Sequence, residues 1–196
     1  MKIIKHLSTC SLFLSIVLSG GVQSTFAAEE KPGKDPMTEM LKPLTGTPFE
    51  AAFIDQMIQH HRGATDMAGL VSSHTKRPEL IKLGATITST QELEIGELTL
   101  WLKKWANAEP AKMPAMAGHE KMMAGMAKLQ AAQGPEFDRM FLEMMMEHHA
   151  GAIRMSELVK EKTIRPELLA FAAKVIKDQT VEIEQMKTWQ TEWFKK

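Results

Sequence analysis

The sequence predicts an all-α protein, a four-helix bundle made of two repeated helical hairpins. Residues 49–105 align with residues 137–193 at a constant offset of 88 without a gap, and 21 of the 57 aligned positions are identical. In each unit, two stretches carry apolar residues at every third or fourth position, the spacing of one helix face. An Arg-Pro-Glu-Leu sequence separates the two stretches, and proline suits a helix start but not a helix interior. Two hairpins with such faces bury them best against each other, as a four-helix bundle.

The first 27 residues have the order of a secretory signal peptide. Lys2 and Lys5 precede a short apolar run over residues 12–18, and small residues follow around Ala27. This run is too short to cross a membrane. We therefore expect cleavage near Ala27, a periplasmic or secreted mature chain, and no membrane span.

Cleavage at that point changes the composition of the chain. It removes two lysines and no acid, so 24 basic residues become 22 against 24 acidic ones, a net charge of −2. It also removes Cys10, the single cysteine, which leaves no disulfide and no thiolate ligand. Of the 16 methionines, all but Met1 remain. No basic patch interleaved with aromatics indicates a nucleic-acid partner.

The mature chain divides into four parts. Residues 28–46 are polar and contain proline, so we expect a mobile leader. The first hairpin occupies residues 47–107 and the second residues 135–196, within one bundle domain over 47–196. A Met-rich linker over residues 108–134 joins the hairpins and has room for a short helix.

Each hairpin has two predicted helices. The capping box Thr47-Pro48-Phe49-Glu50 predicts the start of the first helix, because its Thr and Glu side chains can satisfy free backbone N–H groups. The face of that helix consists of Phe49, Phe53, Met57, His60, Ala64, Met67, Val71 and His74. The second helix begins near Pro78, with the face Leu80, Leu83, Ile87, Gln91, Glu94, Leu98, Trp101 and Trp105.

Polar residues interrupt these apolar faces at mid-length. His60 lies about 16 residues before the turn near Arg77, and Gln91 and Glu94 lie about 15 and 18 residues after it, so antiparallel helices bring them level. By the same counting, His148 and His149 lie level with Gln179 and Glu182. A buried carboxylate needs a partner, and a Glu that holds one imidazole nitrogen leaves the other free as a metal ligand. We predict that the histidines bind metal and that these Gln and Glu residues support them.

Methionines accompany both histidine pairs. Met57 and Met145 lie one turn before the pairs, Met67 and Met155 follow within two turns, and Met140 and Met144 extend the second helix face. Glycine follows each pair at Gly63 and Gly151, which indicates the close approach of a helix or ligand, because mid-helix glycine costs about 1 kcal/mol relative to alanine. The alternative is that these histidines and methionines only fill the core.

The linker carries a second set of candidate ligands among Pro, Gly, Ala and Lys. They are Met113, Met116, His119, Met122, Met123 and Met126. Thioether sulfur is a soft ligand for Cu(I) and its analogue Ag(I), and imidazole suits both copper states. We predict a soft-ion site here, with an amphipathic linker helix as the alternative.

The motifs Met57-Ile58-Gln59-His60-His61-Arg62-Gly63-Ala64 and Met145-Met146-Glu147-His148-His149-Ala150-Gly151-Ala152 resemble domain-of-unknown-function family 305. The resemblance covers both repeat units. It implies a ferritin-like four-helix bundle that binds copper in the periplasm through His and Met. On this sequence the implied ligands are Met57, His60, His61, Met67, Met145, His148, His149 and Met155.

Together these observations predict a copper-binding protein, for Cu(I), Cu(II) and Ag(I), that buffers, transfers or resists copper. A copper efflux or delivery protein is a candidate partner. Two alternatives remain: a redox-active di-metal or haem bundle, and a metal-free interaction bundle. Di-iron bundles use Glu and Glu-x-x-His, whereas this chain has Gln-x-x-Glu and His-His, and it has no Cys-x-x-Cys-His haem motif. No nucleophile–base pair indicates a hydrolase, so we do not expect an enzyme.

Overall fold

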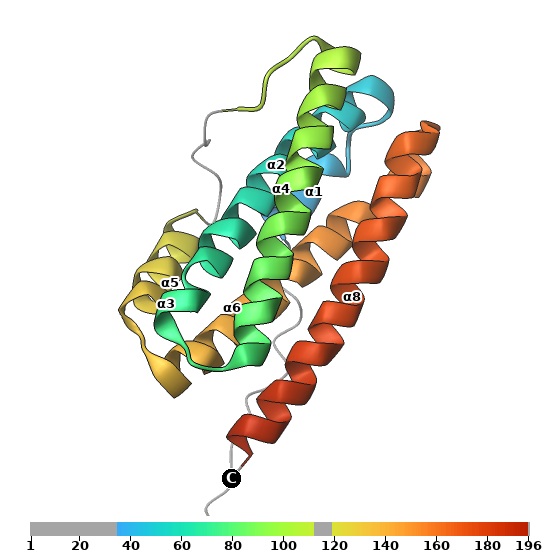
Figure 1. Ribbon diagram of the computed structural model, residues 1–196. Helices are drawn as coiled ribbons and strands as arrows, with labels where there is room; N and C mark the ends of the chain where they lie inside the picture. Colours follow the sequence, from blue (N-terminus) through green and yellow to red (C-terminus); the bar gives the residue numbers. More distant parts are fainter. Residues whose placement is uncertain (1–34, 112–118, 196) are drawn as a thin grey trace, which may run out of the picture. The chain divides into compact units, whose positions relative to one another are not determined.

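The computed structural model describes residues 35–111 and 119–195, apart from the side chains of residues 119–122. The described residues form helices and no strands, which confirms the all-α fold class. Four long helices make two hairpins: α2 (Gly46–Gly69) with α4 (Pro78–Ala106), and α6 (Gly134–Glu157) with α8 (Pro166–Phe194) (Figure 1). The short helices are α1 (Pro36–Leu41), α3 (Val71–His74), α5 (His119–Ala131) and α7 (Val159–Lys162).

Proline determines where α4 and α8 begin. Pro78 and Pro166 each occupy the first turn of their helix, where a missing N–H costs nothing. The capping box predicted at Thr47 is wrong, because α2 already begins at Gly46 and its N-cap, Thr45, makes no side-chain capping bond. Gly46 has a φ of 59°, a left-handed conformation that glycine adopts without strain. The single first helix predicted through His74 is also interrupted, since α2 ends at Gly69 and α3 follows Leu70.

The leader expected over residues 28–46 needs a correction for its described part. Asp35 caps α1 through its carboxylate, which accepts bonds from the backbone N–H groups of Met37 and Thr38. Leu41 in α1 is completely buried. Burial of the Leu41 side chain stabilises the packing of this segment against the bundle. The polar composition of the segment does not predict that packing.

The apolar core consists of two clusters, and each takes residues from both hairpins. The first, the Phe49 cluster, includes Phe49, Phe53, Met57, Leu98, Met155, Phe171 and Val175. The second, the Phe137 cluster, includes Met67, Leu80, Ile87, Phe137, Phe141, Met145 and Met186. The hairpins therefore share their core and do not form separate units.

An arginine in the turn of each hairpin binds a carboxylate of the other hairpin. Arg77 Nε donates to Asp138 Oδ2 at 2.9 Å, and its guanidinium lies 4.1 Å from the ring centroid of Trp193. In the other direction, Arg165 Nε donates to Glu50 Oε2 at 2.6 Å and lies 4.5 Å from the Trp105 ring. Asp138 and Glu50 are buried, so each arginine neutralises a carboxylate that would otherwise be costly. The repeated Arg-Pro-Glu-Leu sequence thus locks one hairpin onto the other.

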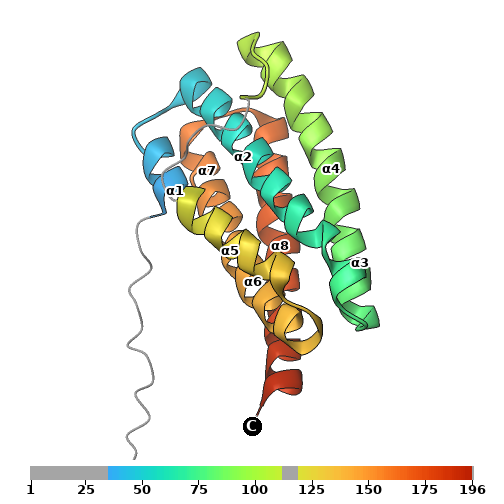
Figure 2. The same ribbon diagram turned by 90° about the vertical axis from the view of Figure 1, so that its left-hand side faces the viewer.

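The linker is attached to the bundle at both of its described ends. Asp55 Oδ1 accepts from the Ala111 N–H at 2.7 Å, and Gln59 Nε2 donates to the Ala111 carbonyl at 2.7 Å. At the other end, α5 lies against α6 (Figure 2), with Leu129 fully buried in the Phe137 cluster. In the described part of the chain, no helix has the length and apolar character that a membrane crossing requires.

Candidate metal centre

His60 and His148 meet where α2 and α6 cross. Their ring centroids are 3.7 Å apart, so the hairpins share one histidine layer. A Cβ on Gly63 would lie 3.1 Å from His148 Nε2, and one on Gly151 would lie 3.1 Å from His60 Nε2. Each histidine of this central pair therefore lies over the glycine of the other hairpin. This confirms the close approach predicted at the two glycines.

His61 and His149 face the second helix of their own hairpins. His149 Nε2 and Glu182 Oε2 are hydrogen-bonded at 2.6 Å. His61 Nε2 lies 2.8 Å from Glu94 Oε2, within ion-pair distance but without the alignment of a hydrogen bond. Both imidazole rings are fully buried. Glu94 and Glu182 are therefore neighbours of the histidines beside which residue counting placed them.

All four core histidines have a ring nitrogen without a partner. Nδ1 of His60, His61, His148 and His149 is buried and makes no hydrogen bond. A buried polar atom without a partner is costly, and a metal ion would satisfy it. Each of the four rings therefore offers one nitrogen that is free to bind a metal ion.

The central pair is held in its neutral form. Burial, reinforced by the neighbouring histidines, keeps the pKa of His60 well below its ordinary value. The same causes, with burial the larger, lower the pKa of His148 to about 3. Imidazole must lose its proton before it binds a metal ion. At neutral pH the rings already have the protonation state that ligation requires.

A lysine distinguishes the two histidine–glutamate pairs. Lys174 Nζ, on α8, lies 2.6 Å from Glu94 Oε1 and 3.2 Å from Asp178 Oδ2. Burial alone would raise the pKa of Glu94, but His61 and Lys174 outweigh it and leave that pKa lowered. The position equivalent to Lys174 in the first repeat is Thr86, so Glu182 has no such lysine. Lys174 was not among the residues predicted for the site, although its alignment with Thr86 marks the difference between the repeats.

The methionines of the repeats lie on both sides of the histidine layer. Met57 and Met155 belong to the Phe49 cluster, and Met67 and Met145 belong to the Phe137 cluster. All four are almost completely buried. Their side chains pack in the two core clusters that flank the histidines.

The linker candidates are only partly described. Met113 and Met116 lie outside the described residues, as do the side chains of His119 and Met122. Met123 is exposed, whereas Met126 packs beside the Phe137 cluster with Met140 and Met144. A Cβ on Gly125 would lie 3.1 Å from the Met144 methyl carbon, so α5 closely approaches a methionine of α6.

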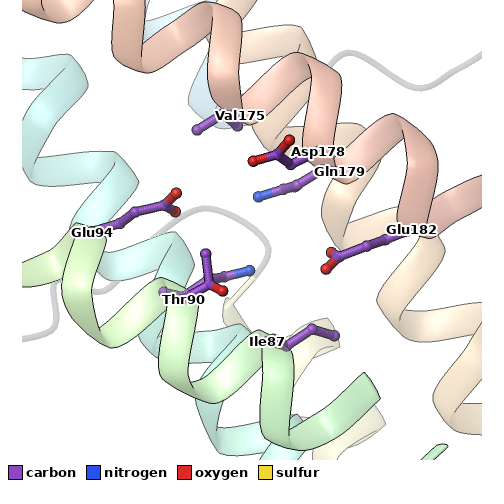
Figure 3. A pocket seen from close by; sticks show the side chains of 8 residues that line it. Ile87, Thr90, Glu94, Val175, Asp178, Gln179 and Glu182 are labelled. Carbon is purple, nitrogen blue, oxygen red and sulfur yellow. The ribbon is translucent and has the colours of Figure 1, made fainter. Parts of the chain in front are cut away.

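The supporting glutamines and glutamates line a pocket between α4 and α8 (Figure 3). Its volume is about 20 Å³, and one side opens to solvent. Gln91 and Gln179 are buried and make no hydrogen bond. Among the described side chains, no three of His, Asp and Glu converge closely enough to hold an ion by themselves. The lining residues are Ile87, Thr90, Gln91, Glu94, Val175, Asp178, Gln179 and Glu182.

Solved structures match about three quarters of this chain. CopM in the Cu(II)-bound form is 36% identical, with a TM-score of 0.68, over 74% of this chain and 97% of that chain. CopM in the Cu(I)-bound form is 34% identical, with a TM-score of 0.65, over 74% and 98%. CopM has also been solved in Ag-bound forms and in the apo form.

A DUF305 fragment from Deinococcus radiodurans is 26% identical, with a TM-score of 0.66, over 76% of this chain and 99% of that chain. A DUF305 protein from Streptomyces coelicolor that is described as secreted is 27% identical, with a TM-score of 0.64, over 73% of this chain and 93% of that chain. No curated protein matches the sequence. The family described as "Domain of unknown function (DUF305)" matches residues 32–190, most of the chain. The chain therefore belongs to the DUF305 family.

Proposed function

We propose that this chain binds copper outside the cytoplasm and buffers or transfers the ion, or confers copper resistance, without catalysing a reaction. One observation carries the proposal: the rings of His60 and His148 meet between the two hairpins, and each has a buried Nδ1 without a hydrogen-bond partner. The similarity to CopM in its Cu(I), Cu(II) and Ag forms supports copper as the ion.

The proposed ligands of the layer combine borderline and soft donors. His60, His61, His148 and His149 supply imidazole nitrogen, which accepts both copper states. Thioethers on either side of the layer would favour Cu(I). Those thioethers belong to Met57, Met67, Met145 and Met155.

Copper-induced stabilisation tests this assignment. The test compares the melting temperatures of the wild type and of a variant with His60→Asn and His148→Asn, each with and without copper. Copper at about 100-fold above its Kd should stabilise the wild type by about 2.7 kcal/mol, and the variant should lose this shift. The apo variant should melt close to the apo wild type, because Nδ1 of neither ring makes a hydrogen bond that the substitutions would remove.

His74→Asn is the matched control. His74 lies outside the layer, with Nδ1 2.8 Å from the Leu70 carbonyl and Nε2 3.1 Å from the Gln130 carbonyl. This variant should keep the full copper shift. A layer variant that also keeps the full shift would exclude His60 and His148 as ligands.

The proposed location depends on residues 1–27, which lie outside the described residues. The match to a DUF305 protein that is described as secreted supports export. Sequencing the N-terminus of protein recovered from the periplasm or medium should give a start near Ala28. Intact Met1 on cytosolic protein would refute export.

A further inference from the structure

The pocket between α4 and α8 lies beside the histidine layer but has different chemistry. Its polar lining consists of oxygen and amide groups: the carboxylates of Glu94, Asp178 and Glu182, and the amides of Gln91 and Gln179. Oxygen ligands suit harder divalent cations, whereas thioether and imidazole suit copper. We propose that this pocket is a second site, which binds one divalent cation through oxygen donors while the ion keeps part of its water shell.

The two glutamines indicate a ligand independently of the acidic residues. Gln91 is 3% exposed and Gln179 is 4% exposed, and neither side chain has a hydrogen-bond partner. Figure 3 shows the Gln179 side chain directed into the space between the helices. Rotation of the terminal amide group by 180° would place its oxygen where its nitrogen lies, and no hydrogen bond of the side chain opposes this rotation. A cation would satisfy two amide oxygens that the protein itself leaves without a donor.

The charge at the pocket matches a divalent ion. Three carboxylates line it, and Lys174 neutralises one charge from outside, which leaves −2. Both carboxylate oxygens of Glu94 already have partners: Lys174 Nζ lies beside Oε1, and His61 Nε2 lies beside Oε2. Glu182 uses only Oε2, for His149, so its other oxygen remains for an ion. The direct carboxylate donor is therefore Glu182, and Asp178 stands at the exposed rim.

The size of the pocket also limits the mode of binding. About 20 Å³ holds roughly one water molecule or one ion, and the open side admits further waters. No three acidic or histidine side chains of the described residues converge at bonding distance, so waters complete the coordination. An ion of the Mg²⁺ type is commonly held in this way, by one or two carboxylates and several waters.

Mn(II) is the probe, because free Mn(II) has an electron paramagnetic resonance signal that weakens when the ion binds. The purified chain should bind one Mn(II) at neutral pH. A variant with Gln91→Leu and Gln179→Leu should bind it at least about tenfold more weakly, since two oxygen ligands are lost. Leucine fills a buried position well, and a melting curve of each variant verifies its fold.

Lys174→Met gives an effect of the opposite sign. It removes a positive charge beside the ion and should tighten Mn(II) binding about tenfold. Glu97→Gln is the control, because Glu97 is an exposed acid on α4 outside the pocket lining, and its loss should leave Mn(II) binding unchanged. No Mn(II) binding by the wild type would overturn the proposal. Unchanged or weaker binding by Lys174→Met would do the same, as would a glutamine variant that binds like the wild type.

The inference does not depend on the copper proposal. If Mn(II) fails to bind while the copper-induced shift persists, only the divalent site is refuted. If Mn(II) binds while the histidine variants keep their copper shift, only the copper assignment is refuted.

Discussion

Substitution of the two glycines under the central histidines is the sharpest test of the shared layer. Gly63→Ala places a methyl group where it would lie 3.1 Å from His148 Nε2. Ordinary van der Waals contact begins near 3.4 Å, so the ring must move by about 0.3 Å or more. Gly151→Ala has the same effect on His60. Both changes displace a proposed ligand without altering its chemistry.

The expected effects on stability and on metal binding differ. Alanine gains about 1 kcal/mol over glycine in a helix interior. Displacement of the histidine offsets that gain, so the apo stability of Gly63→Ala should stay within about 1 kcal/mol of the wild type. Copper affinity should fall about tenfold or more, because ligand positions must be held closely for binding. The variant with both substitutions should lose more than either single variant.

The assay combines denaturant unfolding of the apo protein with competition for Cu(I) against a chromogenic chelator. Gly96→Ala is the matched control, since its Cβ would have no neighbour within 4 Å. It should gain about 1 kcal/mol of stability and keep its copper affinity. If Gly63→Ala binds copper as tightly as Gly96→Ala does, the central pair is not the copper site.

Three further predictions concern other parts of the molecule. Replacing the linker methionines Met113, Met116, Met122, Met123 and Met126 with leucine should lower the number of Ag(I) ions bound and leave Cu(II) binding nearly intact; equal loss of both ions would show that the linker is not a separate site. The unfolding free energy of the apo protein should fall as pH drops below 6.5, because His148 becomes protonated in the unfolded chain there, whereas the fold keeps the pKa of His148 near 3. Denaturant unfolding at about pH 5 should show a loss of about 2 kcal/mol for this residue. An unfolding free energy that does not change with pH would contradict this prediction. Arg77→Met should cost about 3 kcal/mol in unfolding free energy, since Asp138 would stay buried without its partner, and a loss below about 1 kcal/mol would show that the arginines of the two turns do not lock the hairpins.

The helices and the level of the polar residues could be predicted because both depend on local spacing. The apolar period and the prolines at 78 and 166 determine the long helices. Counting from the turn then places Glu94 at His61 and Glu182 at His149, as the structure shows. These inferences need only the geometry of one antiparallel hairpin.

Contacts between the two hairpins could not be predicted by counting residues from a turn. The meeting of His60 and His148 depends on how α2 crosses α6, which packing over the two glycines determines. The capping box at Thr47 failed because a positive-φ glycine one residue earlier starts α2. The leader was misjudged because a single buried side chain, Leu41, matters more than the polar composition around it.

X-ray absorption of the copper-loaded chain tests the central claim most directly, because it identifies the atoms bound to the ion. For the Cu(I)-loaded wild type, the account predicts imidazole nitrogen and thioether sulfur together in the first shell. The imidazole contribution should decrease in the variant with His60→Asn and His148→Asn. A first shell of oxygen ligands alone, or a spectrum that the two substitutions leave unchanged, would contradict the account.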